Sequence, residues 1–374
     1  MKKVILITAN RSDFGIQRKL IKLLQKEKKF KFYLVATGAH LEKKYGNTIS
    51  EIKKDKIKIT KKIKVKVKNY NTRNVMKIFA NSSLKFFDYY EKIKPNLVII
   101  LGDRYEMLAA TIPTITLNIP VAHIHGGERT QGSFDDCFRN MITDIASLHF
   151  TCHDIYKKRV CEIKSSNKNI YNFGSLSIED IHKFNFQTKK FLENKFKIKF
   201  ASKNILLTYH PETKNKKFNH KSFGQILKAI INFKDINFFF TLPAPDPGNL
   251  SIIKQIQIFC KKRTNCYFVP SFGKNSYFSM LNYIDGVIGN SSSGIIEVPS
   301  FKIPTINIGN RQTGRLLSKS VISCECKKNV IQKNMNKIFT KNFKKKIKNT
   351  KNIFFKKNTA ANILKKIKDY LNEK

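Results

Sequence analysis

Short apolar runs alternate with amphipathic stretches along most of this chain, and this alternation constrains its fold more than any other feature. Such a pattern is typical of parallel β-sheets whose strands are connected by crossover helices. With 374 residues, the chain is long enough for two domains that each bury a core of their own. We therefore predict two Rossmann-like, doubly wound α/β domains, with ligands bound at the carboxyl ends of the strands.

In the first half of the sequence, we expect strands at 3–9, 31–37, 96–101, 121–125, 148–152 and 170–173, and helices that include 16–25, 76–92 and 105–117. In the second half, we expect strands at 205–209, 238–242, 266–269, 286–288 and 305–308, and helices at 222–233, 252–261, 277–283 and 294–298. A polar stretch from Ile178 to Lys203 is interpreted as the domain connection. The predicted domains are therefore 1–177 and 178–357, followed by a terminal segment, 358–374, that contains a helix over 360–371.

The chain is strongly basic, with a formal net charge of +46, and this charge raises the alternative of a nucleic-acid-binding protein. Only ten of its 72 basic residues are arginine, however, and the lysines are spread over every segment. A compositional drift of this kind favours a solvated surface over a binding face. The densest tract, 53–68, alternates Lys with Ile or Val, which predicts a half-exposed strand. We expect no nucleic-acid partner, because the sequence contains no signature of a nucleic-acid-recognition fold.

No apolar run reaches the roughly 20 residues that a membrane-spanning helix requires, so we expect no membrane association. The N-terminal apolar stretch is interpreted as a first strand, because Asn10, Arg11 and Asp13 interrupt it and no cleavage site follows. The seven cysteines are scattered, as expected for reduced thiols in the cytoplasm. Cys324 and Cys326 lack further ligands nearby, so we predict no metal site there.

Two of the expected strands in the first half end in polar residues. The turn from Asn10 to Gly15 leads into a helix, and amides at a helix start together with Arg11 would form an anion site. Asp103 and Arg104 follow the apolar run at 97–101, which places them at the carboxyl edge of a sheet. The alternatives are an ordinary strand–helix turn in the first case and a structural ion pair in the second.

A third strand contains His123 and His125 and continues into a Gly-Gly loop with Glu128, seven residues before Asp135. We interpret His123 as a core residue, whereas His125 lies beside the glycines and is a site candidate. Carboxylates from separate segments that meet in one cleft provide the groups needed for general acid–base chemistry on a sugar. The loop is therefore a candidate for proton transfer.

In the second half, His210 ends one expected strand, and a Gly289-Asn-Ser-Ser-Ser-Gly294 turn ends another before a short helix. Small hydroxyl residues and glycine at such a position would form a phosphate cradle. Six of the ten arginines fall in these motifs, which favours the bidentate binding of phosphate or carboxylate. The residues thus indicate a two-domain enzyme with a phosphorylated ligand.

Five motifs in order resemble the hydrolysing UDP-N-acetylglucosamine 2-epimerases, bacterial relatives of the epimerase half of the animal sialic-acid enzyme. They are NRSDFG at Asn10, GDRYE at Gly102, HIHGGE at His123, GNSSSGIIE at Gly289 and RQTGR at Arg311. The resemblance implies a GT-B fold, in which two Rossmann-like domains close over a nucleotide sugar in the cleft between them and the last helix crosses back to the N-terminal domain. It also implies a homodimer or homotetramer.

The resemblance further implies a reaction that needs no metal or nicotinamide cofactor. A base removes the proton at C2 while UDP departs from C1, and water then adds to give N-acetylmannosamine and UDP for nonulosonic acid biosynthesis. The implied catalytic residues are Asp103, Glu128, Asp135 and His125. The residues implied to bind the UDP-sugar are Arg11, Arg104, His210, Ser291, Ser292, Ser293, Gly294, Glu297 and Arg311.

Several alternatives remain open at this point. The same reaction on UDP-2,4-diacetamido-2,4,6-trideoxyglucose, which leads to legionaminic acid, would use the same motifs. A GT-B glycosyltransferase would need an acceptor. In some relatives the position of His125 is a catalytic Glu, so the division between base and acid is open. The family usually has an Asn-containing turn near the nucleotide, where this chain has the turn from Pro243 to Gly248. This difference leaves the contacts to uridine or to the sugar open.

Overall fold

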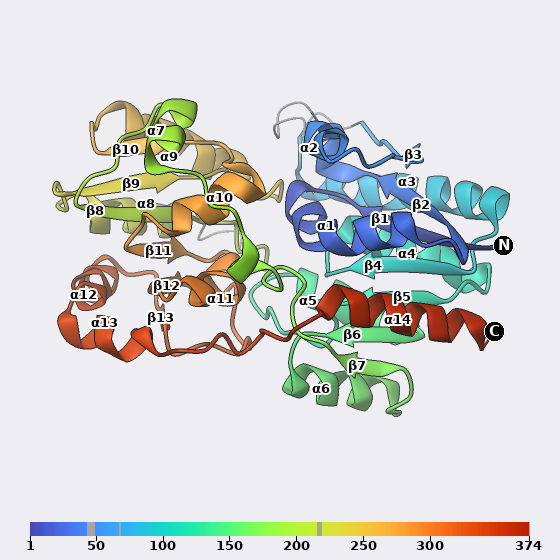
Figure 1. The fold of residues 1–374 in the computed structure, drawn as a ribbon. Coiled ribbons are helices and arrows are strands. Elements are labelled where there is room, and N and C mark those ends of the chain that lie inside the picture. Colours follow the sequence, from blue (N-terminus) through green and yellow to red (C-terminus); the bar gives the residue numbers. More distant parts are fainter. Residues whose placement is uncertain (43–48, 67–68, 215–218, 374) are drawn as a thin grey trace. The chain divides into compact units, whose positions relative to one another are not determined.

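The computed structural model describes residues 1–42, 49–66, 69–214 and 219–373. The chain forms two compact units (Figure 1). Unit 1 consists of residues 1–128, 135–179 and 354–374, and unit 2 consists of residues 129–134 and 180–353. The segment 129–134 thus belongs to unit 2, although both of its neighbours in the sequence belong to unit 1. The domains predicted from the sequence, 1–177 and 178–357, place residues 129–134 in the first domain together with their neighbours.

Unit 1 is built on a parallel seven-stranded sheet with the order β3-β2-β1-β4-β5-β6-β7. Its strands are β1 (Lys2–Thr8), β2 (Phe30–Ala36), β3 (Lys61–Lys62), β4 (Leu97–Leu101), β5 (Val121–Ile124), β6 (Leu148–Thr151) and β7 (Ile170–Asn172). Its helices are α1 (Arg11–Lys26), η1 (Gly38–Leu41), α2 (Ile49–Lys54), α3 (Thr72–Ile93), α4 (Tyr105–Thr116), α5 (Asp135–Ile145), α6 (Asp154–Lys164) and α14 (Thr359–Asn372).

Both faces of this sheet are apolar, because its strands are covered by helices on either side. Val4 and Leu6 of β1 pack into a core with α1 and α14, whereas Ile5 and Ile7 pack into a second core with α3 and α4. Alternate residues of one strand point to opposite faces, so a strand buried on both sides reads as a continuous apolar run. The apolar run of β4 therefore predicted its strand correctly.

The C-terminal helix α14 belongs to unit 1 and packs against α1, the first helix of the chain (Figure 1). Its apolar stripe is buried through Ile363 and Ile367. At its first turn, the amide of Ala360 donates to Oε2 of Glu179 at 3.0 Å. The two ends of unit 1 are thus joined through one core.

Unit 2 is built on a parallel six-stranded sheet with the order β10-β9-β8-β11-β12-β13. Its strands are β8 (Lys203–Thr208), β9 (Ile236–Phe240), β10 (Cys266–Phe268), β11 (Gly286–Gly289), β12 (Thr305–Ile308) and β13 (Val321–Cys324). Its helices are η3 (Ile181–Lys183), α7 (Lys189–Phe196), α8 (Asn219–Ile230), α9 (Asn249–Lys261), α10 (Gly273–Leu281), α11 (Ser293–Ile296), η5 (Val298–Phe301), α12 (Lys328–Ile338) and α13 (Lys341–Lys348).

The predicted half-exposed strand over 53–68 is much shorter in the structure. Its first two residues end α2, and within the described part of the tract only Lys61–Lys62 forms a strand, β3; residues 67–68 lie outside the described residues. Ile57 and Ile63 are buried all the same. The alternating pattern therefore reflects buried isoleucines in a mostly irregular segment that pairs with β2 only around β3.

Candidate active site

Three neighbouring strands of unit 1 bring most of the predicted catalytic residues to one edge of the sheet. Leu101 of β4 pairs with Ile124 of β5, and Ile124 pairs with Phe150 of β6. The residues that follow these positions therefore lie at the same carboxyl edge. They are Asp103 after β4, His125 after β5 and Cys152 after β6.

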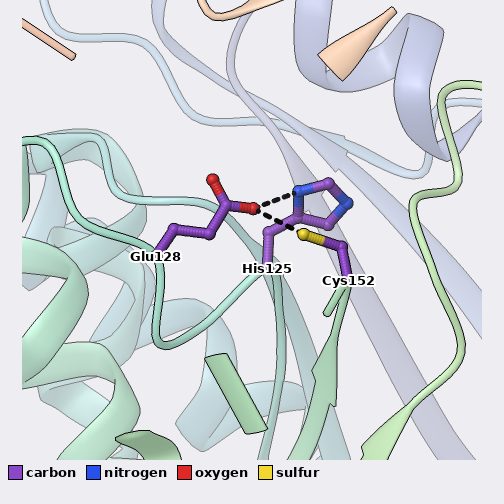
Figure 2. A group of neighbouring side chains, drawn as sticks. All are labelled: His125, Glu128 and Cys152. Carbon is purple, nitrogen blue, oxygen red and sulfur yellow. Dashed lines mark hydrogen bonds and ion pairs between the residues drawn. The ribbon is translucent and has the colours of Figure 1, made fainter. Parts of the chain in front are cut away.

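His125, Glu128 and Cys152 form a buried cluster at this edge (Figure 2). Nδ1 of His125 lies 2.9 Å from Oε1 of Glu128. Sγ of Cys152 donates to the same oxygen at 3.2 Å. Nδ1 of His125, which follows β5, and Sγ of Cys152, which follows β6, thus both hold Oε1 of Glu128 in place.

The backbone between His125 and Glu128 makes a turn that is unusual for residues other than glycine. His125 has a φ of +65°, in the left-handed region, and its amide donates to the carbonyl of Phe150 at 2.8 Å. Gly127 has a φ of +80°, and a Cβ there would lie 2.4 Å from the carbonyl oxygen of Tyr156. Backbone strain of this kind concentrates at functional sites. Gly127 is thus required for the turn that carries Glu128 back to His125.

Arg139 of α5 contacts two of the predicted catalytic residues, Asp103 and Glu128, although its side chain is almost completely buried. Its guanidinium forms an ion pair with Asp103 and donates to the main-chain oxygen of Glu128 at 2.8 Å. Nη1 also lies 3.6 Å from Oδ1 of Asp136, one turn earlier on the same helix. Arginine suits this position because its planar guanidinium presents several donors in a fixed geometry.

Asp135 is the first residue of α5 and is buried. It precedes Arg139 by four residues, so both lie on one face of the helix. His123 is also buried, with its ring nitrogens 3.1 Å from Oγ1 of Thr143 and 2.8 Å from the carbonyl oxygen of Gly102. Burial lowers the pKa of His123 to about 4, which fits its interpretation as a neutral core residue.

Arg104 lies beside Glu106 and Tyr105 at the start of α4. Its Nε donates to Oε2 of Glu106 at 3.1 Å, and its guanidinium lies 5.0 Å from the ring centre of Tyr105. Glu106 is buried, so Arg104 compensates a carboxylate inside unit 1. Asp103 forms an ion pair with Arg139, and Arg104 forms one with Glu106. These ion pairs at the edge of the sheet fit both a site role and a purely structural role for the two residues.

The start of α1 does not match the expected amide-based anion site. The amides of Ser12 and Asp13 donate to the side chain of Asn10, and the amides of Ala9 and Asn10 donate to the carboxylate of Asp13. These four donors are therefore occupied within a capping box. Arg11 is the first residue of the helix and supplies the positive charge of this turn.

In unit 2, the side chain of Asn290 joins the Ser/Gly turn to the end of β8. It accepts from the amide of His210 at 2.7 Å and donates to the carbonyl oxygen of His210 at 2.9 Å. Arg311 and Gln312 donate to the carbonyl oxygen of Asn290 at 3.2 and 2.8 Å. Three predicted nucleotide-binding segments are thus held together by one asparagine.

The turn itself begins at Gly289, which has a φ of +135° and whose Cβ would lie 1.8 Å from the carbonyl oxygen of Thr208. Ser291, Ser292 and Ser293 are half-buried, and the Ser293 hydroxyl hydrogen-bonds to that of Tyr277. Gly294 is the second residue of α11, which ends at Ile296 and is followed by the half-buried Glu297 as its C-cap. The predicted helix at 294–298 is therefore a single turn of α-helix that continues into η5.

The turn from Pro243 to Gly248 has a defined role in unit 2. The amide of Ala244 donates to Nδ1 of His210 at 2.9 Å. Because a backbone amide can only donate, Nδ1 is the acceptor and a neutral His210 carries its proton on Nε2. This segment therefore selects the tautomer of a predicted UDP-binding residue.

Sequence reasoning gave no role to Cys152 or Asn290, and it included Arg139 only as one of the six motif arginines expected to bind phosphate or carboxylate. Arg139 had a signal, because it is one of the scarce arginines and lies four residues after Asp135. Asn290 lay inside a quoted motif, but its bonds to His210 depend on the pairing of β8 with β11. Cys152 had no signal in the sequence, since its contact with Glu128 depends on β6 lying beside β5.

None of the helices that the structure describes is both long and apolar enough to cross a membrane. Each unit carries a doubly wound parallel sheet, and this pair of sheets defines a protein of the GT-B fold class, as predicted. Residues 22–368 match the family model described as UDP-N-acetylglucosamine 2-epimerase. The chain belongs to this family.

The chain is 37% identical over 344 residues to the GDP/UDP-N,N′-diacetylbacillosamine 2-epimerase (hydrolyzing) of Campylobacter jejuni, covering 92% of this chain and 89% of that protein. It is 34% identical over 375 residues to the polysialic acid biosynthesis protein P7 of Escherichia coli, covering 100% and 95%. Its fold is similar to that of the UDP-GlcNAc 2-epimerase of Neisseria meningitidis bound to UDP-GlcNAc, with a TM-score of 0.84, 20% identity and coverage of 98% and 100%.

Proposed function

We propose that this protein is a hydrolysing UDP-sugar 2-epimerase that converts UDP-N-acetylglucosamine to N-acetylmannosamine and UDP. The observation that carries the proposal is that Arg139 joins two carboxylate-bearing segments, through Asp103 and the main chain of Glu128. Inversion at C2 requires a proton to leave one face of the sugar and another to arrive on the opposite face. Two separately positioned proton-transfer groups meet that requirement.

In the first step, a carboxylate takes the proton from C2, the C1–O bond to UDP breaks, and a double bond forms between C1 and C2. In the second step, water supplies a hydroxyl to C1 and a proton is delivered to C2 from the other face. Glu128, with His125 beside it, and Asp103, beside Arg139, are the groups we assign to these transfers. Asp135, buried at the start of α5, is the third candidate.

The departing diphosphate needs positive charge and hydrogen-bond donors. We assign this role to unit 2, where Asn290 holds His210, Arg311 and the Ser/Gly turn in one network. The remaining assigned contacts on this unit are Ser291, Ser292, Ser293, Gly294 and Glu297. Arg11 and Arg104 of unit 1 are assigned as additional phosphate contacts. Because UDP is a good leaving group under these conditions, the reaction requires neither a metal nor a nicotinamide.

A second candidate substrate is UDP-N,N′-diacetylbacillosamine, the 2,4-diacetamido-2,4,6-trideoxy sugar nucleotide. The identity of 37% with a relative named for that sugar favours it, and the identity of 34% with a polysialic acid protein favours the first substrate. Both reactions would use the same proton-transfer and diphosphate groups. The sugar substituents at C4 and C6 distinguish the two substrates.

A proton NMR time course in deuterated water, run with each sugar nucleotide, tests the proposal. We expect free UDP to appear together with a 2-epimerised free sugar that carries deuterium at C2. Release of UDP without deuterium at C2 would refute the elimination mechanism. Epimerisation with UDP still attached would identify a reversible epimerase, and the substrate with the higher kcat/KM decides between the two sugars.

A further inference from the structure

The cluster of His125, Glu128 and Cys152 presents three metal-ligating atoms to one point in unit 1 (Figure 2). Nδ1, a carboxylate oxygen and Sγ all lie within 4.8 Å of one another, and all three residues are buried. Within the described part of the chain, this is the one group of three His, Cys, Asp or Glu side chains with such spacing. A thiolate, an imidazole and a carboxylate form a set that zinc commonly accepts.

We propose that these three residues bind a thiophilic divalent cation of the Zn²⁺ class. In a tetrahedral zinc site, ligand atoms lie roughly 3.3–3.6 Å apart, given bonds of about 2.0 Å to nitrogen and oxygen and about 2.3 Å to sulfur. The observed separations from Oε1 are 2.9 Å to Nδ1 and 3.2 Å to Sγ. An ion can therefore replace the two hydrogen bonds with an outward movement of a few tenths of an ångström at each pair.

The surroundings of the cluster hold its ligands in place. In the cluster without a metal, Nδ1 of His125 carries the proton that it donates to Oε1. Binding of a cation moves this proton to Nε2, which lies 3.4 Å from Oγ of Ser175, and the lone pair of Nδ1 then faces the cation. The main-chain oxygen of Glu128 accepts from Arg139 at 2.8 Å and from Arg159 at 3.1 Å. The left-handed backbone of His125 further limits where its ring can lie.

Charge balance selects a divalent ion that binds sulfur strongly. Binding breaks the S–H bond of Cys152 and releases its proton to solvent, so that the thiolate and the Glu128 carboxylate together neutralise a +2 ion. This neutral site suits a unit that already contains Arg139 and Arg159 near the same loop. Hard cations such as Mg²⁺ prefer oxygen ligands and bind a thiolate weakly, so they would not gain the negative charge of Cys152.

Occupation of the site would stop catalysis, and this consequence rests on the proposed function. A metal ion on Oε1 and Nδ1 competes with the proton that Glu128 must accept or deliver. The cation would therefore act as an inhibitor, and the metal-free cluster would be the active form. Binding and inhibition are separate observables, so each can fail without the other.

Cobalt(II) is the probe for binding, because a Co²⁺–thiolate bond gives a charge-transfer band in the near ultraviolet. We expect the reduced full-length protein to show this band at one Co²⁺ per chain and Zn²⁺ to displace it. Cys152→Ser should abolish the band, whereas Cys137→Ser, which removes an exposed thiol of α5, should retain it. Glu128→Gln keeps the thiol and should weaken Co²⁺ binding by about tenfold or more.

The absence of the band in the wild type, or its survival in Cys152→Ser, would overturn the proposal. Loss of the band in Cys137→Ser instead would show an adventitious surface ion only. Glu128→Gln retains Cys152, so its Co²⁺ affinity tests the proposal even if Cys152→Ser fails to fold. An affinity equal to that of the wild type would count against Glu128 as a ligand. Inhibition of the sugar-nucleotide reaction by Zn²⁺ is then tested in the NMR assay. If the protein turns over neither sugar nucleotide, Co²⁺ binding can still be measured, so the two proposals can fail separately.

Discussion

The buried guanidinium of Arg139 forms an ion pair with the carboxylate of Asp103, which follows the neighbouring strand β4. The same guanidinium donates to the main-chain oxygen of Glu128 at 2.8 Å. One side chain of α5 therefore sets the position of two loops that follow different strands. Its role is to position the groups assigned to proton transfer.

Arg139→Lys should lower kcat about 100-fold and leave KM nearly unchanged. Lysine retains the charge, but its single ammonium cannot hold Asp103 and the Glu128 carbonyl in the present geometry, and a misplacement of about 1 Å costs a rate factor of that size. Steady-state kinetics with the preferred sugar nucleotide provide the test. Arg263→Lys, at a partly exposed arginine of unit 2, serves as the matched control and should behave like the wild type. An unchanged kcat in Arg139→Lys would contradict the positioning role.

Glu128→Gln and Asp103→Asn should each lower turnover by about 100-fold to 10,000-fold, the range that general acid–base groups contribute. Each amide keeps the size of the side chain but cannot accept or deliver a proton at neutral pH. Affinity for UDP, measured by calorimetry, should stay within about twofold of the wild type. Glu162→Gln, on the exposed side of α6, is the control for a neutralised carboxylate. Near-normal turnover in both active-site variants would refute the assignment.

The fold could be predicted from the sequence because parallel strands buried on both faces are apolar throughout. The run at 97–101 formed β4 with its predicted C-terminal residue, and Glu128 was correctly placed on the loop after β5. The strand β5 ends at Ile124, one residue before its predicted end at His125. The error over 53–68 has a different cause. There, Ile57 is buried outside any strand, and pairing with β2 is limited to the short strand β3 and the amide of Ile63. The sequence period alone cannot distinguish such a segment from a full strand.

The contacts of the candidate site could not be predicted, because they depend on the order of strands in each sheet. Cys152 is 24 residues from Glu128 and meets it only because β6 pairs with β5. The turn at Asn10 shows the opposite case, in which a familiar motif was interpreted as a ligand site. Its amides donate to the side chains of Asn10 and Asp13, and these partners become visible only in the folded chain.

Arg311→Met should weaken UDP binding by about tenfold to 100-fold, since a charge-assisted hydrogen bond contributes about 1.5–3 kcal/mol. The Ser/Gly turn should keep its position in this variant, because Gln312 still donates to the Asn290 carbonyl at 2.8 Å. Isothermal titration with UDP measures the loss directly. Arg263→Met removes an arginine of the same unit that lies outside the turn and should bind UDP normally. Equal affinities of the two variants would remove Arg311 from the diphosphate site.

Ile367→Ala should destabilise unit 1 by about 2–5 kcal/mol, because the side chain is completely buried where α14 packs on α1. Truncation leaves a cavity that the surrounding helices fill only in part. Hydrogen exchange of amides in β1 reports on unit 1 alone and should show the corresponding loss of protection. Ile258→Ala, at a side chain that is 59% exposed, should change stability by less than about 0.5 kcal/mol. Similar small effects in both variants would show that α14 contributes little to the core.

Asp13→Asn should stabilise unit 1 above pH 7 and have little effect near pH 4. Burial raises the pKa of Asp13 to about 7, from 3.8 for an exposed aspartate, so the folded state holds a proton that the unfolded state has lost between these values. The wild type therefore loses stability as the pH rises from about 4 to about 7, by up to about 1.4 kcal/mol per pH unit. Asparagine carries no charge at any pH, and its oxygen can accept the amides of Ala9 and Asn10 as the carboxylate does.

The test of this prediction compares hydrogen-exchange protection of α1 in the wild type and in Asp13→Asn at several pH values, after correction for the intrinsic exchange rate. The extra protection of α1 in Asp13→Asn over the wild type should grow from pH 4 to pH 7 and stay constant above pH 7. Asp88→Asn, at an exposed aspartate of α3, removes the same charge from solvent and should leave the profile of the wild type unchanged. A difference that falls with rising pH would mean that the ionised Asp13 stabilises the start of α1, since its capping bonds would then outweigh the cost of burial.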